Sequence, residues 1–156
     1  MEQCIHFNDL RICDCAKVIL HFQVVCIIFD LLLKKYFMTT KEIANRLVEL
    51  CRKADYETTQ AELFADDAVS VEPYSTPEFE KETKGKQAIK EKGEKWDAMV
   101  ETTHAIEVSD PIVAGNSFAC TMRVHVTMKD KGEMDMTELC VYKVKDGKII
   151  EEQFFI

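Results

Sequence analysis

The chain has 156 residues, of which 47% are hydrophobic, and it carries a formal charge of -8 with a pI near 5.1. A chain of this size buries roughly two-thirds of the surface that it exposes when unfolded, which is enough for one compact domain. The negative charge argues against nucleic acids and anionic membranes, whose binders present a clustered basic face. The lysines between residues 81 and 95 alternate with glutamates, as on a solvated helix face.

The first 37 residues differ in composition from the rest of the chain. They hold four of the seven cysteines and no net charge, with four acidic and four basic residues, and they include the apolar run of residues 18–33. That run is shorter than the roughly 20 residues that span a bilayer, and it lacks the flanks of a secretory signal. We expect one of three explanations: the working protein starts at Met38, the segment is a short membrane anchor, or it is an extra helix packed on a domain of residues 38–156.

The cysteines indicate a reducing compartment. Cys13 and Cys15 are one residue apart, which is neither a redox pair nor a zinc-ligand pair. Cys51, Cys120 and Cys140 occupy apolar positions, where a thiol behaves as a small hydrophobic group. We therefore expect free thiols in a cytoplasmic protein, with no metal site and no cofactor.

Two helices are predicted at the start of the domain, and a third follows near its middle. Thr39 and Glu42 form a capping box, and the apolar spacing after them predicts a helix over residues 40–53. Asp55 caps a second helix that runs to about residue 64. A third helix starts at Lys86, and Gly93 in its interior suggests close packing against a neighbour.

Residues 63–73, LFADDAVSVEP, predict a helix end, an acidic turn at Asp66 and Asp67, and a short strand that stops at Pro73. In this strand two valines alternate with Ser70 and Glu72, so one face is apolar and the other polar. Glu72 is then a fixed carboxylate that either serves a site or caps nearby backbone donors. The polar loop of residues 74–85 is expected to form a rim or lid.

The remaining residues predict a meander of strands whose register follows from its turns. The Asp146-Gly147 turn predicts four opposite pairs: Lys145 with Lys148, Tyr142 with Glu151, Cys140 with Gln153, and Glu138 with Phe155. The turns near residues 131 and 115 predict five more: Met128 with Met134, Val126 with Met136, Val124 with Glu138, Ile106 with Val124, and His104 with Val126. One face is then apolar apart from Glu138, Glu151 and Gln153.

Glu138 and His104 are the notable residues of this face. A carboxylate among apolar neighbours is costly unless it is neutral or paired, so Glu138 is a site residue, the partner of a buried donor, or a group that reaches solvent at the sheet edge. His104 is either a base or a hydrogen-bonded rim histidine. Trp96 and Tyr142 suit both a core and a pocket wall.

The order of these elements resembles the SnoaL-like family of the nuclear transport factor 2-like superfamily over residues 39–156. The resemblance rests on the residue 63–73 motif, on Gly85, Ala88 and Ile89 at the third helix, and on the closing strands ELCVYKVKDGKIIEEQFF. It implies an α+β, cone-shaped fold in which helices pack on a curved, mostly antiparallel sheet that encloses a pocket. The outer face of such a sheet often forms a homodimer.

Ketosteroid isomerases and polyketide cyclases belong to the same superfamily and use pocket carboxylates for proton transfer beside a carbonyl. Glu72 matches the isomerase base, with Glu for Asp and one residue fewer before the proline. The position of the isomerase's tyrosine donor falls on Val48, so that donor is missing. Glu138 matches the second acid only if an insertion is allowed. The resemblance thus implies an acid-base pocket more than steroid isomerase activity.

Two classes of function remain. The first is a cofactor-free isomerase, cyclase or hydratase acting on a small apolar molecule, and the second is a non-catalytic binding module or homodimeric scaffold. The candidate catalytic residues are Glu72, His104 and Glu138. The candidate ligand-binding residues are Trp96, Tyr142, Gln153, Val124, Met136 and Phe155. The face expected to form a dimer carries Thr121, Arg123, His125, Leu139, Val141 and Phe154.

Overall fold

The computed structural model describes residues 37–156. The N-terminal segment of residues 1–36, including its four cysteines and apolar run, lies outside the described residues. Residues 38–156 form one compact unit. Within residues 37–156, no helix has the length and apolar character that crossing a membrane requires.

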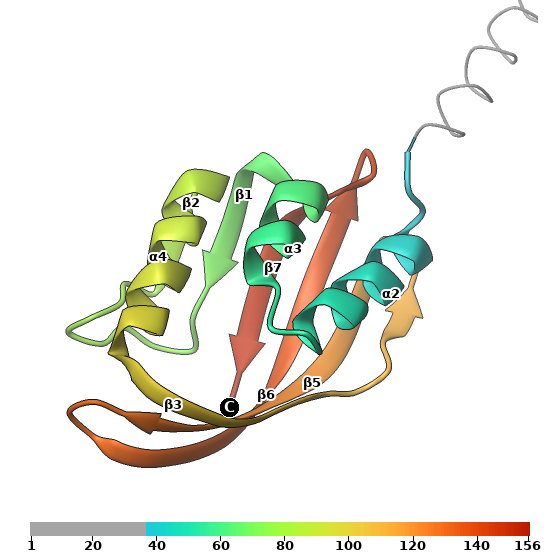
Figure 1. Cartoon of the computed structure of the whole chain (residues 1–156). Helices are drawn as coiled ribbons and strands as arrows, with labels where there is room; N and C mark the ends of the chain where they lie inside the picture. The colour runs from blue at the N-terminus through green and yellow to red at the C-terminus, as the bar shows by residue number, and fades with distance from the viewer. Residues whose placement is uncertain (1–36) are drawn as a thin grey trace, which may run out of the picture. The chain divides into compact units, whose positions relative to one another are not determined.

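Three helices pack on one face of the sheet (Figure 1). Helix α2 (Thr40–Cys51) has the predicted capping box: Thr39 Oγ1 accepts from the Glu42 N–H at 3.3 Å, and Glu42 Oε2 accepts from the Thr39 N–H at 2.7 Å. Helix α3 (Tyr56–Leu63) starts at Asp55, whose side chain accepts from the Thr58 N–H. Helix α4 is Lys86–Met99. Side-chain capping therefore fixes two of the helix starts as the sequence predicts.

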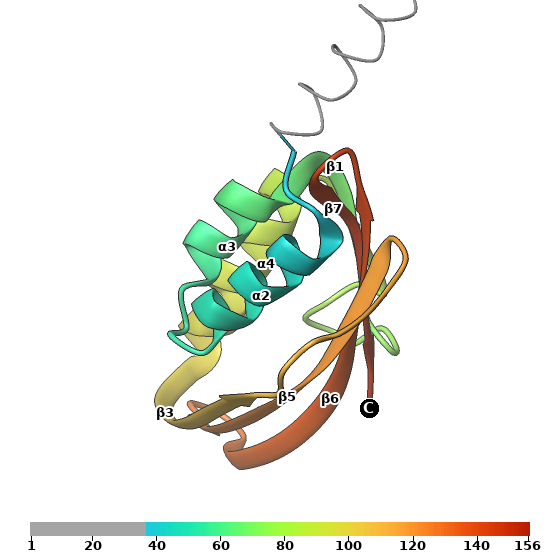
Figure 2. The same ribbon diagram turned by 90° about the vertical axis from the view of Figure 1, so that its right-hand side faces the viewer.

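The sheet has the strand order β2-β1-β7-β6-β5-β3, with β4 paired to β5. Its strands are β1 (Phe64–Val71), β2 (Glu82–Lys84), β3 (Val100–Val108), β4 (Ile112–Ala114), β5 (Ser117–Met128), β6 (Gly132–Lys145) and β7 (Lys148–Phe155). Only the β1–β7 pairing is parallel among these strands. Figure 2 shows β3, β5 and β6 bending beneath the helices. The predicted α+β fold, helices on a curved and mostly antiparallel sheet, is confirmed.

The core lies between the helices and the inner sheet face. Its fully buried large side chains come from both layers and include Ile43, Leu47, Leu63, Ile89, Val126 and Ile149. Burying side chains of this size contributes about 1.5–3 kcal/mol each before conformational entropy is counted. The free thiols of Cys51, Cys120 and Cys140 are buried in the same core, as predicted. These buried side chains hold the helices against the inner face of the sheet.

A bulge corrects the predicted register of β6 and β7. Lys145 lies opposite Lys148 as predicted, but Ile149 pairs with Val144 and Glu151 with Lys143, which leaves Ile150 as an extra residue. Beyond this point every pair moves by one residue, and a one-residue slip turns side chains to the other face. The inner positions of β7 are therefore Glu152 and Phe154, and Glu151, Gln153 and Phe155 lie on the outer face.

The predicted β5–β6 register was two residues off but placed its side chains on the correct face. Val126 lies opposite Met134, Val124 opposite Met136, and Met122 opposite Glu138. Strand β6 begins at Gly132, directly opposite Met128, so the turn is tighter than predicted. Because side chains alternate with a period of two, the error left Glu138 on the inner face.

The placement of His104 was wrong. Ile106 pairs with Val124 as predicted, but the β3–β5 register shifts between Thr103, which pairs with Val126, and Ala105, which pairs with His125. His104 lies at this irregularity, and its side chain contacts Thr127 and His125 on the outer face. An irregularity of this kind reorients a side chain without any signal in the local hydrophobic pattern.

Two smaller predictions also differ from the structure. Asp66 and Asp67, expected in a turn, lie within β1 where its pairing with β7 is irregular between Phe64 and Val69. A methyl group at Gly93 would lie 3.8 Å from the Gln60 side chain, its nearest contact outside the helix. Close packing therefore does not require the glycine.

We predict that Gly93→Ala stabilises the domain by up to about 1 kcal/mol, because alanine lowers the conformational entropy of the unfolded chain and the helix has room for the methyl group. Urea unfolding followed by circular dichroism measures the change. Gly85→Ala is the control, since the backbone φ of +90° there strains any other residue. A loss of stability in Gly93→Ala would show that the added methyl group disturbs the packing of helix α4 beside Gln60.

Candidate functional site

A cavity of about 650 Å³ lies between the helices and the inner sheet face. All three helices and five strands contribute to its wall. The apolar part of the wall includes Leu47, Phe64, Phe79, Ile89, Trp96, Ile106, Met122, Val124, Val126, Met136, Tyr142 and Phe154. Cavities of this size that are mostly apolar and carry a few converging polar groups are typical binding sites for small molecules.

An ion pair between β1 and α4 forms one polar side of the cavity. Lys92 Nζ donates to Glu72 Oε1 at 2.7 Å and to Ser70 Oγ at 2.5 Å. The Lys92 and Glu72 side chains are only 16% and 26% exposed. Glu72 follows β1 directly, and its backbone N–H donates to the Lys81 carbonyl at 2.8 Å, which holds the strand end in place. The carboxylate predicted at position 72 therefore faces the cavity with a cationic partner.

Glu138 is the second carboxyl group of the cavity, and it projects from the inner face of β6 opposite Met122. Burial among apolar groups raises its pKa to about 7, and the nearby charges of Glu72 and Glu152 act in the same direction. The Cys140 thiol, whose Sγ lies 3.8 Å from Glu138 Oε1, and the Lys92 ammonium oppose this rise. Glu138 can therefore hold a proton near neutral pH.

Glu152 is a third carboxyl group of the cavity wall, and the sequence prediction missed it. It is 7% exposed, and burial raises its pKa, while Lys92 and a hydrogen bond with Ser70 act in the opposite direction. Two glutamates, Glu151 and Glu152, stand next to each other in β7, and only the bulge at Ile150 decides which one faces inward. No local sequence signal marks that bulge.

The far side of the cavity carries polar groups from helix α3 and the end of α4. Burial raises the pKa of Tyr56 above its ordinary value, and charges including those of Asp97 and Glu138 add to the effect. Burial also raises the pKa of Asp97. Both residues line the cavity and were missed by the sequence prediction. This part of the wall thus carries a hydroxyl group and a carboxyl group from two helices.

The structure brings six of the nine predicted site residues into the cavity wall. Glu72, Glu138, Trp96, Tyr142, Val124 and Met136 line it. Tyr142 is buried and its ring is stacked on Phe118 with centroids 4.7 Å apart. Because burial raises the pKa of Tyr142 well above 10, its hydroxyl stays protonated.

The other three predicted site residues are on the outer face, for the register reasons given above. His104 Nε2 lies 2.7 Å from Thr127 Oγ1, and its ring lies 4.7 Å from that of His125. Gln153 pairs with Val141, and Phe155 is 45% exposed. A role in cavity chemistry for these three residues has no support from their positions. Among the described residues, no group of acidic, histidine and cysteine side chains could hold a metal ion.

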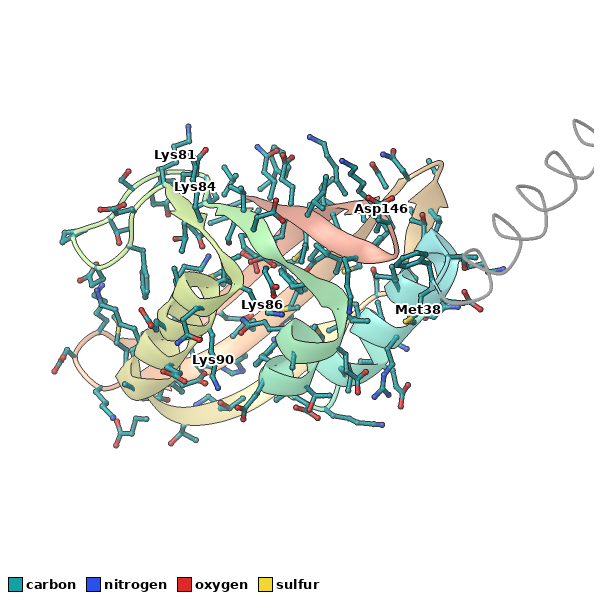
Figure 3. The ribbon with its side chains drawn as sticks, turned by 90° about the horizontal axis from the view of Figure 1, so that it is seen from above. Met38, Lys81, Lys84, Lys86, Lys90 and Asp146 are labelled. Carbon is teal, nitrogen blue, oxygen red and sulfur yellow. The ribbon has the colours of Figure 1, made fainter. Side chains whose placement is uncertain are left out.

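The basic residues near the start of α4 have acidic partners. Figure 3 shows Lys81, Lys84, Lys86 and Lys90 extending from the β2 region onto α4. Three of these lysines pair with acids: Lys84 with Glu82 at 2.9 Å, Lys86 with Asp66 at 2.6 Å, and Lys90 with Glu57 at 2.7 Å. Exposed pairs of this kind neutralise a surface and contribute about 0–1 kcal/mol. These three pairs fit the predicted solvated face, but Lys92, which was predicted on the same face, is 16% exposed and lies in the cavity wall instead.

Helices packed on a bent, mostly antiparallel sheet around a carboxyl-lined cavity define a nuclear transport factor 2-like protein. The SnoaL-like domain family matches residues 38–156, and the chain belongs to this family. The predicted resemblance is therefore confirmed. A comparison with curated proteins found no significant match.

Solved structures with the same fold agree with this assignment. A proposed SnoaL-like polyketide cyclase from Mesorhizobium loti is 35% identical, with a TM-score of 0.71, over 76% of this chain and 100% of that chain. IdmH, a proposed polyketide cyclase from Streptomyces antibioticus, is 22% identical, with a TM-score of 0.59, over 76% and 91%. A cystatin-like protein of unknown function from Xanthomonas campestris is 18% identical, with a TM-score of 0.65, over 76% and 90%. The last two show the fold alone.

We predict that Glu138→Gln is more stable than the wild type and that the difference in the free energy of unfolding grows between pH 5 and 8. The folded-state pKa of about 7 lies above the ordinary value of 4.5, so the stabilisation from protonated Glu138 is complete below about 4.5 and is lost as the pH rises through 7. The difference should reach at most about 3 kcal/mol. Guanidinium unfolding at several pH values measures it.

Glu151→Gln is the matched control, because Glu151 lies on the outer face, where it accepts a hydrogen bond from Lys143 at 2.6 Å. Its stability difference from the wild type should not grow over the same pH range. Parallel pH profiles for Glu138→Gln and the wild type would contradict the prediction.

Proposed function

We propose that this protein binds a small, largely apolar molecule in the cavity and catalyses cofactor-free proton transfer on it, in an isomerase-, cyclase- or hydratase-like reaction. The observation that supports this most strongly is the difference between two carboxyl groups of one apolar cavity. Glu72 is paired with an ammonium group, whereas Glu138 has a pKa raised to about 7. A carboxylate with an ammonium partner and a second, buried carboxyl group with a raised pKa in the same cavity are suited to act as base and acid.

In the proposed reaction Glu72 is the base. It removes a proton from a carbon next to a carbonyl group of the ligand, and the electron pair moves onto the carbonyl oxygen. Protonated Glu138, with the Tyr142 hydroxyl, donates hydrogen bonds to this oxygen as it becomes an enolate. Returning the proton to another atom completes an isomerisation, and attack of the enolate carbon on a second carbonyl closes a ring. Ketosteroid isomerases combine an aspartate base with a protonated carboxylic acid in the same way.

The similarity to the Mesorhizobium loti protein, itself proposed to be a polyketide cyclase, supports a carbonyl-containing ligand. The wall also supports an apolar ring system, because it presents Trp96, Phe79 and Phe154. Phe79 comes from the loop of residues 72–81 and lies against Trp96 with ring centroids 6.5 Å apart. This contact supports the prediction that the loop forms a rim of the site.

The test uses enolisable cyclic ketones and lactones in heavy water. We expect the wild type to speed deuterium incorporation beside the carbonyl, and Glu72→Gln and Glu138→Gln to lose about 10²-fold or more of that rate. Nuclear magnetic resonance follows the exchange. Quenching of Trp96, the single tryptophan of the chain, reports binding independently of catalysis.

Glu151→Gln is again the control and should retain the exchange rate, since its carboxylate lies outside the cavity. Quenching by ligands without any deuterium incorporation would favour the alternative function, a non-catalytic binding module. If no compound of these classes caused either quenching or exchange, that result would contradict a cavity for small carbonyl compounds.

We also propose that residues 38–156 form a homodimer through the outer face of the sheet and work in the cytoplasm. The outer face carries exposed apolar groups beside polar ones: Leu139 is 42% exposed and Phe155 is 45% exposed. Phe154, predicted on this face, lies inside instead because of the β7 bulge. Mixed apolar and polar surfaces of this kind suit a symmetric interface. The free cysteines of the described residues agree with a reducing compartment.

A chain that begins at Met38 should unfold cooperatively and sediment at twice the monomer mass at micromolar concentration. Leu139→Lys should convert it to a monomer, because a charge within the proposed interface is costly to bury. Tyr74→Lys, at a loop residue that is 61% exposed, should leave the mass unchanged. A wild-type monomer would show that the outer face is solvated.

A further inference from the structure

Three carboxyl groups of the cavity share the influence of one ammonium group. Lys92 donates directly to Glu72, and its charge also lowers the pKa of both Glu138 and Glu152. Glu72 directly follows β1, Glu138 belongs to β6 and Glu152 belongs to β7. Across residues 37–156, Lys92 is the one basic side chain within salt-bridge distance of any of the three. The cluster therefore has fewer positive charges than carboxyl groups.

The ammonium group of Lys92 makes most of its contacts with the protein itself. An ammonium has three N–H donors. Two are directed to Ser70 Oγ and Glu72 Oε1, and the nitrogen lies 5.3 Å from the centroid of the Phe154 ring, within the range of a cation–π contact. Two of the three donors are therefore directed to side chains of the protein. These contacts suit a group that holds neighbouring side chains in place.

Helix α4 holds Lys92 in this position. Ile89, one turn earlier on the same face of the helix, is 1% exposed and lies in the core. Lys86, six residues before Lys92, instead pairs with the exposed Asp66 at 2.6 Å. Two lysines of one helix thus make similar ion pairs, one beside the cavity and one at the surface.

We propose that Lys92 is a positioning residue that assigns the two roles in the cavity: by binding Glu72 it orients that carboxylate as the base, and it leaves Glu138, which makes no hydrogen bond to the ammonium group, as the acid. The inference rests on the proposed function. The groups around Glu138 are Glu72 from the end of β1, Cys140 on its own strand, Glu152 on β7, Tyr56 on α3 and Lys92 on α4.

Without the lysine, Glu72 and Glu138 become two neighbouring acids with no cation between them. Without the hydrogen bond from Lys92, the Glu72 carboxylate loses the side-chain contact that fixes its orientation, and the two carboxyl groups no longer differ in having a cationic partner. The ion pair with Lys92 is therefore the contact that distinguishes Glu72 from Glu138.

The test is Lys92→Met in the full chain labelled with carbon-13 at the glutamate carboxyl groups, with Glu138→Gln used to assign the Glu138 signal. We expect the titration midpoint of Glu138 to rise by about one pH unit, since a nearby cation is removed. Lys92→Arg should keep the midpoint near that of the wild type. Lys86→Met, which removes the surface ion pair of the same helix, is the matched control and should not move the midpoint.

Kinetics supply a second measurement. In Lys92→Met, kcat for deuterium exchange should fall at least tenfold with little change in KM, because the Glu72 carboxylate is no longer held in the orientation of the base. Lys92→Gln provides the same charge removal if the methionine variant does not unfold cooperatively. An unchanged Glu138 midpoint in the folded variant would overturn the inference.

The titration separates this inference from the proposed function. A shifted midpoint in a protein whose wild type catalyses no exchange would mean that the proposed reaction is wrong and that Lys92 still controls the carboxyl charges. An unshifted midpoint in an active Lys92→Met variant would mean that the reaction stands and that another group orients Glu72.

Discussion

The long ladder between β5 and β6 is the constraint on which the rest of the fold depends. Twelve residues of β5, from Ser117 to Met128, pair with β6 without a shift in register. Their inner face carries much of the core and also Glu138, and the bend of these strands beneath the helices leaves space that the core does not fill. The same ladder therefore supplies both the stability of the domain and the buried carboxyl group of its site. A substitution that disturbs its register would affect both.

Whether the sequence prediction placed a side chain on the correct face depended on the size of the register error. An error of an even number of residues kept the face, and an error of an odd number changed it. The error of two residues between β5 and β6 kept Glu138, Val124 and Met136 on the inner face. The single extra residue at Ile150 exchanged Gln153 and Phe155 for Glu152 and Phe154, and the irregularity at His104 moved that side chain to the outer face. Turns and hydrophobic alternation are local signals, and a bulge inside a ladder depends on packing across the sheet. Capping residues were predictable because their partners lie three residues away.

The partners that define the site could not be inferred from local patterns. Lys92 lies in a segment of alternating lysines and glutamates, which on its own is typical of a solvated helix face, and its partners Ser70 and Glu72 are about twenty residues away. Family resemblance identified position 72 through its motif, but the motif does not contain the lysine. Whether a charged residue faces a cavity depends on how helix α4 is rotated against the sheet, and Ile89 anchors that rotation.

The parallel pairing of β1 with β7 affects the order in which parts of the fold can form. Ser70 of β1 pairs with Glu152 of β7, so the strand that leads into Glu72 obtains this neighbour only when β7 is available. Contacts between segments that are distant in the sequence are slow to form. The carboxyl cluster is therefore complete only after β7 has paired with β1. A nascent chain that still lacks β7 would have an open sheet edge in place of a site.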